Sequence, residues 1–512
     1  MTEPTQTAEA LLRYARIPGK PVLASWMGGP TVEAGEDILN RAGIPTFPYP
    51  DTAARAFHFM WRYAENLRGL YETPAGADDD AGAGPDRAAA TRLIDAVRKD
   101  GRSLLTEAES KRLLALYGVP TVPTEMATTE GEAARCARAL GYPVAVKLHS
   151  RKITHKTDVG GVKLDLGDAR AVKAAFKAIK AAVTLKAGAG HFDGVTVQPM
   201  ITLADSYEVI LGSSLDPQFG PVLLFGAGGE LVEVFKDRAL ALPPLNATLA
   251  RHLMAETKIY TALKGVRGRP PVDMAALETA IVRFSRLVSE QPWIKEVDIN
   301  PLLASPERIV ALDARVVVHG PEVAATSIPR PAIRAYPAQY VQAWTARDGT
   351  RLTVRPIRPE DEPLMVAFHQ TLSDRSVRLR YFHPLKLSQR VAHERLIRVC
   401  FTDYDRDMLL VVERRDPKTG HPEILGVGRL SKIPGHDEAE FAMLISDVWQ
   451  AKGMGTKLLG TLLQVARDEK LSRVSADILA ENLEMQRVCK RLGFRVARDE
   501  DGQDMRAEIA LQ

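Results

Sequence analysis

The chain has 512 residues, a length that predicts roughly three domains. Hydrophobic residues make up 45% and charged residues 26%, the composition of a globular protein. The 68 basic and 64 acidic residues nearly balance, so we expect neither nucleic acid nor a membrane as a partner. No apolar run is long enough to span a bilayer, and the N-terminus lacks the pattern of a secretory signal. Three widely spaced cysteines exclude a disulfide scaffold or a cysteine-rich zinc site, and a reducing cytoplasm is the simplest location.

Two stretches without apolar periodicity divide the chain. Residues 73–89 combine small, acidic, glycine and proline residues, as flexible linkers do. Residues 327–339 contain three prolines, which forbid a continuous helix. We therefore expect a multidomain protein of α/β and α+β class with five parts: a partial domain at 1–75, a linker at 76–95, a domain at 96–325, a linker at 326–345 and a domain at 346–512.

The first segment alternates predicted helices and strands. Strands are expected at 21–27 and 43–47, and the flanking helices at 7–15, 32–39 and 51–70. This βαβα order is typical of parallel sheets. Two strands cannot bury a parallel sheet on both faces. The segment therefore represents half a domain, and we expect that the chain has been shortened at its N-terminus or that a partner supplies the other half.

The middle segment contains an unusual lysine in a predicted buried strand, 143–148 (PVAVKL). A buried ammonium group needs a partner of opposite charge, and a phosphate would serve for Lys147. The run HKTDVGGV follows, and its glycines Gly160 and Gly161 could fold over phosphate groups. This part of the chain therefore has features of a phosphate-binding region.

Further strands are expected in the middle and last segments. Val162, Leu164 and Leu166 alternate with polar residues, which predicts a strand with one buried face. Continuous apolar runs predict buried strands at 222–225 and 309–312, and the last segment begins with a strand at 351–356.

Two oxygen-bearing side chains suggest a cation site. Asn300 lies in VDINPL and Asp313 in ALDAR, both at predicted strand positions. Antiparallel neighbours at that spacing could hold one Mg²⁺, which prefers oxygen ligands and keeps several waters.

Together these motifs resemble the ATP-grasp domain of NDP-forming acyl-CoA synthetases, over roughly residues 100–320. The resemblance implies that Lys147 contacts the phosphates of ATP, that Gln198 lies near the adenine, and that Asn300 with Asp313 binds Mg²⁺. Glu208, Gly160 and Gly161 also match this nucleotide site, and His155 matches a histidine that carries phosphate between sites in that family. Without the resemblance, His155 would be interpreted as an ordinary surface-loop residue. The first segment is similar to the end of the flavodoxin-like CoA-ligase domain of the same synthetases.

The last segment contains a strand, a glycine turn and an apolar helix. Residues 439–445 alternate as a strand, and Gln450, Gly453 and Gly455 precede a helix with a leucine face. Such a turn aims backbone N–H groups at one point, where the helix dipole adds partial positive charge. Glycine also allows close approach of a ligand. We therefore favour a pyrophosphate or other anion site over an ordinary strand-to-helix turn.

Residues 350–512 resemble a GNAT-superfamily N-acetyltransferase. Gln450-x-x-Gly453-x-Gly455 matches the acyl-CoA pyrophosphate loop of that family, and its second motif is matched by Asn482, Met485 and residues 492–494. The resemblance implies that acetyl-CoA is the co-substrate and that its pantetheine arm lies between two splayed strands. A backbone amide of Leu444 or Ile445 is then a candidate donor to the thioester oxygen.

Acetyl transfer to an amine needs a general base, because a free lysine has a pKa near ~10.4. Glu440, on the strand before the turn, is the leading candidate, and we expect apolar neighbours to raise its pKa. A carboxylate that merely faces water is the alternative interpretation, and Glu438 is the rival base. The general acid stays unassigned, since Cys489 is better interpreted as a core residue.

The order of the three parts is similar to that of bacterial multidomain protein lysine acetyltransferases. The resemblance implies an enzyme that acetylates a reactive lysine of AMP-forming acyl-CoA synthetases, with an ATP-grasp region that senses ligands. The alternatives are an ADP-forming acyl-CoA ligase subunit and a sensor without transfer. A basic cluster of Arg375, Arg378 and Arg380 is interpreted as a solvated helix face rather than a docking site. The oligomeric state is left open.

Overall fold

The computed structural model describes residues 3–73, 84–153, 156–201, 205–229, 237–266, 268–499 and 502–511. The chain divides into two compact units, Met1–Glu72 and Thr73–Gln512. Within the described residues, no helix combines the length and the apolar character needed to cross a membrane.

The first unit has the expected alternation of helices and parallel strands. Strands β1 (Ala24–Ser25) and β2 (Thr46–Phe47) pair in parallel. Its helices are α1 (Pro4–Leu11), η1 (Leu12–Tyr14), η2 (Gly29–Val32), α2 (Glu33–Arg41) and α3 (Pro50–Leu70). The described core contains only three fully buried residues, and α3 leaves large apolar side chains exposed, among them Phe57, Met60 and Trp61. Two short strands and three helices thus bury little apolar surface on their own.

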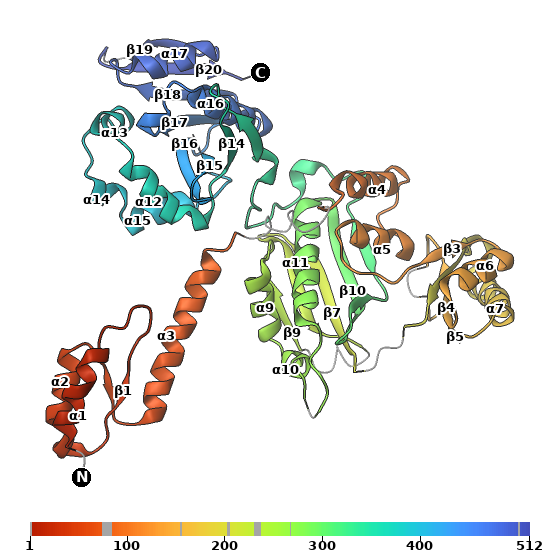
Figure 1. Ribbon diagram of the computed structural model, residues 1–512. Helices are drawn as coiled ribbons and strands as arrows, with labels where there is room; N and C mark the ends of the chain where they lie inside the picture. Colours follow the sequence, from red (N-terminus) through yellow and green to blue (C-terminus); the bar gives the residue numbers. More distant parts are fainter. Residues whose placement is uncertain are drawn as a thin grey trace. The chain divides into compact units, whose positions relative to one another are not determined.

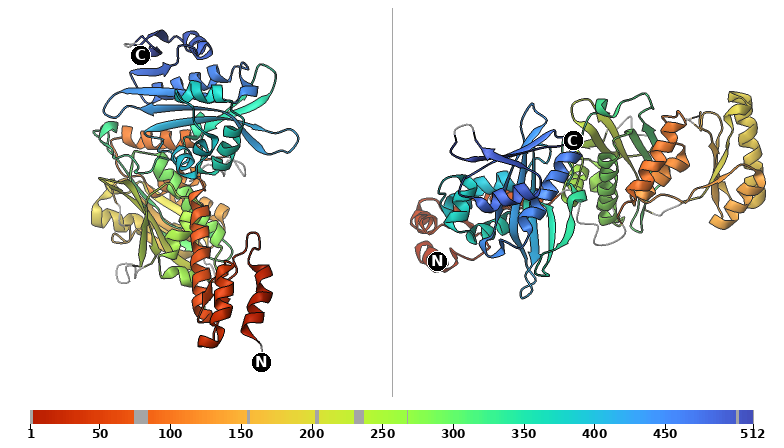
Figure 2. Two further views of the ribbon diagram at one scale, coloured as in Figure 1. Left: turned by 90° about the vertical axis from the view of Figure 1, so that its left-hand side faces the viewer. Right: turned by 90° about the horizontal axis from the view of Figure 1, so that it is seen from above.

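The second unit begins with a four-stranded sheet in the order β3-β6-β4-β5. Its strands are β3 (Glu125–Ala127), β4 (Val144–His149), β5 (Val162–Leu166) and β6 (Gly194–Pro199), and α6 (Glu130–Leu140) and α7 (Ala169–Ala187), which is followed by η4 (Ala189–His191), cover one face (Figures 1 and 2). Val146 and Val197 pack against these helices. Because side chains alternate along a strand, Lys147 and Gln198 lie on the opposite face.

The predicted alternation of the strand at 162–166 is wrong in one respect. The side chain of Leu164 is 54% exposed, although the pattern predicted that it would be buried. β5 is the edge strand of its sheet, its register with β4 shifts, and Asp165 has a φ of 54°. This irregularity breaks the two-residue repeat on which the prediction depended.

A second sheet in the same unit has the order β11-β10-β7-β8-β9, with β12 also paired to β10. Its strands are β7 (Tyr207–Asp216), β8 (Gly220–Ala227), β9 (Arg238–Ala241), β10 (Ile294–Ala304), β11 (Ile309–Ala311) and β12 (Arg315–Val318). Among the described residues, the helices of this part of the molecule are α4 (Arg87–Lys99), α5 (Glu107–Leu116), α9 (Ala247–Ala255), α10 (Ile259–Leu263) and α11 (Met274–Glu290). Large side chains such as Leu113, Phe225 and Phe284 fill the core between sheet and helices.

The C-terminal part is an eight-stranded sheet in the order β13-β14-β15-β16-β17-β18-β20-β19. Its strands are β13 (Gln342–Thr345), β14 (Arg351–Pro356), β15 (Asp407–Arg415), β16 (Pro422–Lys432), β17 (Glu438–Ile445), β18 (Arg473–Ile478), β19 (Arg495–Arg498) and β20 (Met505–Ala510). One core includes residues of α16 (Met454–Asp468) and α17 (Leu483–Arg491). Another core lies against α12 (Glu362–Gln370), α13 (Asp374–Tyr381) and α15 (His393–Cys400), with α14 (Leu387–Arg390) nearby in the chain. Short 3-10 helices are η5 (Ala325–Ser327), η6 (Ala338–Tyr340), η7 (Pro359–Asp361) and η8 (Asp447–Trp449).

Both expected linkers are shorter than the composition suggested. The range 76–95 includes the start of α4, whose Ala90 and Ile94 are buried in a core. The range 326–345 includes β13, which pairs with β14 as the first strand of the C-terminal sheet. In both places, a regular element begins directly after the glycine- or proline-rich residues that define the linker.

The strands β17 and β18 separate soon after they meet. They run parallel, and only the pairs Glu438–Arg473, Ala439–Val474 and Glu440–Ser475 are in register. β17 continues to Ile445 and pairs there only with β16. The later residues of β17 therefore have an open edge on the side of β18, in agreement with the expected splay.

Candidate functional site

The turn between β17 and α16 is held from inside by the side chain of Gln450. Its amide nitrogen donates to Ser376 Oγ at 3.1 Å and to the carbonyl oxygen of Ile445 at 3.2 Å. Ser376 Oγ in turn donates to Asp447 Oδ1 at 2.7 Å. Burial raises the pKa of Asp447. Hydrogen bonds from Ser373 and Ser376 have the larger, opposite effect, so the pKa lies below its usual value. Gln450 thus fixes the shape of the turn and joins it to α13.

Glycine is found at the two positions of the turn for different structural reasons. Gly453 has a φ of 95° and caps the N-terminus of α16. A Cβ there would lie 3.5 Å from Arg347 Nε and 3.7 Å from Trp344. Gly455 lies in the first turn of α16, where a Cβ would approach only Val488, at 3.8 Å. The first requires glycine for its backbone, whereas the second leaves room beside the helix N-terminus.

A cavity of about 660 Å³ opens in front of this turn. Backbone N–H groups at the start of α16 and the helix dipole favour an anion at that end. The arginine side chains that line the cavity are Arg347, Arg375, Arg380, Arg487 and Arg491. Burial, together with nearby Arg429 and Arg395, lowers the pKa of Arg380. The arrangement suits an elongated ligand with a strongly anionic end.

The interpretation of the basic cluster as a solvated face is wrong for one of its three members. Arg380 is half-buried and lines the cavity, because α13 lies against the turn that follows β17. Arg375 and Arg378 are exposed as expected, although Arg375 also lines the cavity. Arg378 forms an ion pair with Glu481 at 3.3 Å.

A smaller cavity of about 270 Å³ contains Glu440. It shares Met443, Asn482 and Met485 with the larger cavity, so the two adjoin where β17 and β18 separate. A ligand anchored at the glycine turn could therefore extend between the strands toward Glu440.

The surroundings of Glu440 are more polar than expected. Its side chain is exposed, and its neighbours across the ladder are Ser431 and Ser475. The expectation of apolar neighbours holds only in part, because these ladder neighbours are polar whereas Leu379 and Phe382 also line the cavity. Among the described residues, no hydrogen bond or ion pair engages its carboxylate. Glu438, in contrast, forms an ion pair with Arg473, at 2.7 Å from each of its oxygens.

The other expected residues of this domain lie near the two cavities. Leu444 and Ile445 line the larger cavity from the open edge of β17. Asn482 lines both cavities but also caps α17, where its side chain accepts a hydrogen bond from the Met485 amide at 3.1 Å. Cys489 is completely buried, and burial raises the pKa of its thiol to about 12. The expectation of a core cysteine is confirmed.

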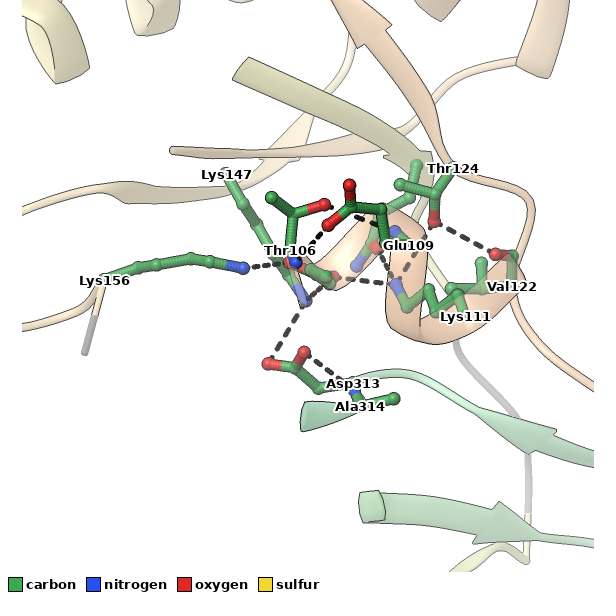
Figure 3. Close-up of polar contacts among 11 residues, drawn as sticks. Thr106, Glu109, Lys111, Val122, Thr124, Lys147, Lys156, Asp313 and Ala314 are labelled. Carbon is green, nitrogen blue, oxygen red and sulfur yellow. Dashed lines mark hydrogen bonds and ion pairs between the residues drawn. The ribbon is translucent and has the colours of Figure 1, made fainter. Parts of the chain in front are cut away.

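A second polar cluster lies in the part of the unit that contains the two smaller sheets (Figure 3). Glu107, the first residue of α5, accepts hydrogen bonds from Lys111 at 2.8 Å and from Lys147 at 3.2 Å. Lys156 forms a further ion pair with its other oxygen. Lys147 also lies 3.9 Å from Asp313. The partner that the buried Lys147 requires is therefore a carboxylate of the same chain.

Glu107 and Lys111 are functional candidates that the sequence did not indicate. Both side chains are 3% exposed. Lys111 also donates to Gln198 at 2.6 Å and to Thr124 at 3.2 Å. Burial lowers the pKa of Lys111 to about 8, although Glu107 opposes this effect. Burial raises the pKa of Glu107, but Lys147, Lys111 and Lys156 together lower it well below its usual range.

The remaining expected residues of the middle segment have mixed placements. Gly161 is packed so tightly that a Cβ would lie 2.8 Å from Leu148 and from the carbonyl oxygen of Lys156. Gly160, with a φ of 72°, completes the same turn, so this pair of glycines shapes the segment that carries Lys156. Glu208 is exposed on β7, with its carboxylate beside Gly229. His155 lies outside the described residues.

Asn300 lies in β10, but Asp313 lies in the short segment between β11 and β12 and not in a strand as expected. Because the Asp298–Arg315 and Leu302–Ala311 pairs share one register, Asn300 and Asp313 fall opposite each other between these two pairs. Burial and the carboxylates of Glu296 and Asp313 raise the pKa of Asp298. In the part of the chain that the structure describes, no group of three or more histidine, cysteine or acidic side chains gathers as a metal site. The available oxygens suit a cation that keeps most of its waters, as Mg²⁺ does.

Comparisons with known proteins agree with this architecture. A family model for the ATP-grasp domain matches residues 96–318, and one for the acetyltransferase (GNAT) domain matches residues 351–495. The ADP-forming acetate–CoA ligase I of Archaeoglobus fulgidus is 33% identical over 320 residues, or 62% of this chain and 45% of that protein. The beta subunit of ADP-forming acetate–CoA ligase I of Pyrococcus furiosus is 38% identical over 234 residues, which cover 46% of this chain and all of that subunit.

A solved structure of another acetyltransferase domain can be compared with the C-terminal domain. The GNAT domain of S. lividans PAT has 28% sequence identity and a TM-score of 0.31, covering 34% of this chain and 99% of that domain. The chain spans less than half the length of the first two curated ligases that it matches. Through its ATP-grasp region, the chain belongs to the family of ADP-forming acetate–CoA ligase beta subunits, and an acetyltransferase domain of the GNAT family follows it.

Proposed function

We propose that the chain is an acetyl-CoA-dependent protein lysine N-acetyltransferase. The observation that carries the proposal is the path from the glycine turn to Glu440. The larger cavity begins at the N-terminus of α16 and adjoins the smaller cavity at the splay of β17 and β18. The pyrophosphate of acetyl-CoA would bind at the first end, and its thioester would lie near Glu440.

The chemistry assigns different roles to the residues along this path. The amine of a lysine attacks the thioester carbonyl, and Glu440 takes its proton directly or through a water molecule. Glu440 is preferred to Glu438 because Arg473 already engages the Glu438 carboxylate. A backbone amide on the open edge of β17, at Leu444 or Ile445, would stabilise the developing oxyanion. The C–S bond breaks, the acetyl group remains on the lysine nitrogen, and CoA leaves as the thiol after protonation.

We further propose that the acceptor is a reactive lysine of an AMP-forming acyl-CoA synthetase and that acetylation inactivates it. The fused region is similar to ligases that are named for acetate and CoA, which supports a regulatory link to acyl-CoA supply. The test is intact-mass spectrometry of a purified AMP-forming acetyl-CoA synthetase after incubation with this chain and acetyl-CoA. A gain of one acetyl group, together with loss of synthetase activity, is the expected result. An unmodified synthetase would contradict this choice of acceptor.

A second candidate function is that of an ADP-forming acyl-CoA ligase subunit. It is favoured by the position of Lys147, which lies 3.9 Å from Asp313 and therefore near the Asn300–Asp313 pair. In that function, Lys147 and Lys156 would bind ATP phosphates, Asn300 and Asp313 would hold Mg²⁺, and His155 would carry a phosphoryl group. Mg²⁺ would neutralise charge on the phosphates. The unit Met1–Glu72 would then be part of a CoA-ligase domain.

The two functions are separated by product analysis. For the acetyltransferase, we expect no release of ADP from ATP, acetate and CoA by the purified chain. Sustained release of ADP that requires both acetate and CoA would establish the ligase instead.

A further inference from the structure

The cluster around Glu107 holds more positive than negative charge. Three ammonium groups share its two carboxylate oxygens, and the side chains of Lys111, Lys147 and Lys156 are only 3%, 11% and 16% exposed. Asp313 lies beyond hydrogen-bond distance of Lys147, and its side chain is 45% exposed. Because unpaired buried charge is costly, such a cluster is well suited to receive another anion.

The three lysines do not have equal freedom. Lys111 uses its three donors on Glu107, Gln198 and Thr124, which fills its hydrogen-bonding capacity. Among the described residues, Glu107 is the only hydrogen-bond partner of the ammonium groups of Lys147 and Lys156. These two ammonium groups therefore keep donors for a ligand, whereas Lys111 is committed to the fold.

The position of Glu107 is also favourable for an anion in general. It is the first residue of α5, a ten-residue helix whose N-terminus is capped by Thr106. The helix dipole adds to the field of the lysines at this point. The carboxylate thus lies among three ammonium groups at a helix N-terminus, and a phosphoryl group that approaches Lys147 and Lys156 would compete with it for them.

We propose that Glu107 is an internal counter-anion at a phosphoryl-binding site. When a phosphoryl group binds, Lys147 and Lys156 form ion pairs with it instead of with Glu107, while Lys111 stays paired with Glu107. The exchange leaves each anion with ammonium partners and removes the excess of positive charge. The exchange also breaks the contact between Glu107 and Lys147, which joins two sheets. Helix α5 packs in the core of the sheet that contains β7 and β10, whereas Lys147 belongs to the four-stranded sheet. The proposal holds whether or not the C-terminal domain transfers acetyl groups.

The test compares Glu107→Gln with the unchanged chain by calorimetric titration of ATP and of inorganic tripolyphosphate, both with a chelator present. Removal of the competing charge should tighten binding of both probes by at least about five-fold, since a unit charge within ~7 Å contributes more than 1 kcal/mol at an effective dielectric constant of ~20. Glu109→Gln is the matched control. It removes a carboxylate from the same helical turn, but one that pairs with Arg102, and binding should not change.

A second variant tests whether Lys156 changes its ion-pair partner from Glu107 to the bound phosphoryl group. Lys156→Met should weaken the binding of both probes, and it should cancel most of the gain in the double variant with Glu107→Gln. If Glu107→Gln does not fold, Glu107→Asp replaces it, because the shorter carboxylate competes less well and should tighten binding in the same direction.

The sign of the change decides the question. Weaker or unchanged binding in a folded Glu107→Gln protein would make Glu107 a residue that only positions the lysines, and would overturn the proposal. Absence of tripolyphosphate binding in every variant would overturn it as well. Acetyl transfer is measured on the same preparations, so a failure of the transferase proposal is recognised separately.

Discussion

Glu438 and Glu440 lie two residues apart on the same face of β17, yet Arg473 forms an ion pair with only the first of them. The second points into the smaller cavity, with Ser431 and Ser475 as its neighbours across the ladder. Two carboxylates of similar sequence context are thus placed in different chemical situations. One is part of the structure, and the other is available to accept a proton.

The difference predicts opposite results for two matched substitutions. Glu440→Gln should lower the rate of acetyl transfer by about 10²- to 10⁴-fold, the usual contribution of a general base, and should leave acetyl-CoA binding within about two-fold of its original value. Glu438→Gln should retain most of the activity. Initial rates and calorimetric titration measure both effects. Equal losses in the two variants would contradict the assignment of the base.

Substitution of Gln450 should weaken acetyl-CoA binding rather than slow the transfer step itself. Gln450→Ala removes the hydrogen bonds to Ser376 and to the Ile445 carbonyl, so the turn loses its internal support. With about 0.5–1.5 kcal/mol for each bond, acetyl-CoA affinity should fall by roughly ten-fold. Gln464→Ala is the control, because the side chain of Gln464 is exposed on α16 and, among the residues that the structure describes, bonds only Asp468. A titration that gives the same affinity for both variants would refute the bracing role.

Gly455 allows binding to be separated from stability. Gly455→Ala should raise the helical propensity of α16 by about 1 kcal/mol, while its methyl group enters the cavity toward Val488. We expect a higher melting temperature together with an acetyl-CoA affinity about ten-fold lower, the cost of a modest steric overlap. Gly460→Ala serves as the control, because a Cβ there meets no atom within 4 Å. It should gain the same stability and bind acetyl-CoA normally.

His369 predicts a loss of stability in weak acid. It is a buried residue of α12, and burial, together with Arg390 and Arg395, lowers its pKa to about 4. In the unfolded chain the imidazole takes up a proton near pH ~6.5, so protonation favours unfolding. Stability should therefore fall as the pH drops from about 6.5 to about 4, by at most about 1.4 kcal/mol for each pH unit. Above this window the residue contributes no pH dependence.

Hydrogen exchange of the α12 amides in the full chain, corrected for intrinsic rates, measures this effect at a series of pH values. His369→Leu should flatten the curve between pH 4.5 and 6.5, a range set by the same two pKa values. The same slope with and without the imidazole would show that other groups cause the loss.

The features that could be predicted from the sequence are local ones. The strand of β17, the glycine turn and the leucine face of α16 follow one another within 30 residues, and each has a short-range pattern. The opposition of Asn300 and Asp313 was also predictable, since an antiparallel pair of short strands fixes its own register. The helix α4, in contrast, could have been found from its apolar spacing, but the composition before it suggested a longer linker.

The features that could not be predicted depend on long-range contacts. Glu107 and Lys111 look like an exposed i,i+4 pair on a helix, and nothing nearby in the chain indicates that Lys147 and Gln198 close over them. Arg380 likewise resembles a residue of a solvated helix face until α13 is packed against the turn after β17. Only the tertiary structure determines which side of such a helix is covered.

The short pairing of β17 with β18 has a mechanical consequence for the C-terminal sheet. Three pairs of residues join the five strands from β13 to β17 to the three strands β18, β20 and β19. The eight strands therefore behave as two smaller sheets that meet at a narrow seam, with α16 as the covalent connection across it. A molecule that forms hydrogen bonds to the open edge of β17 and contacts β18 would add to these three pairs. Its binding would therefore strengthen the connection between the two halves of the domain.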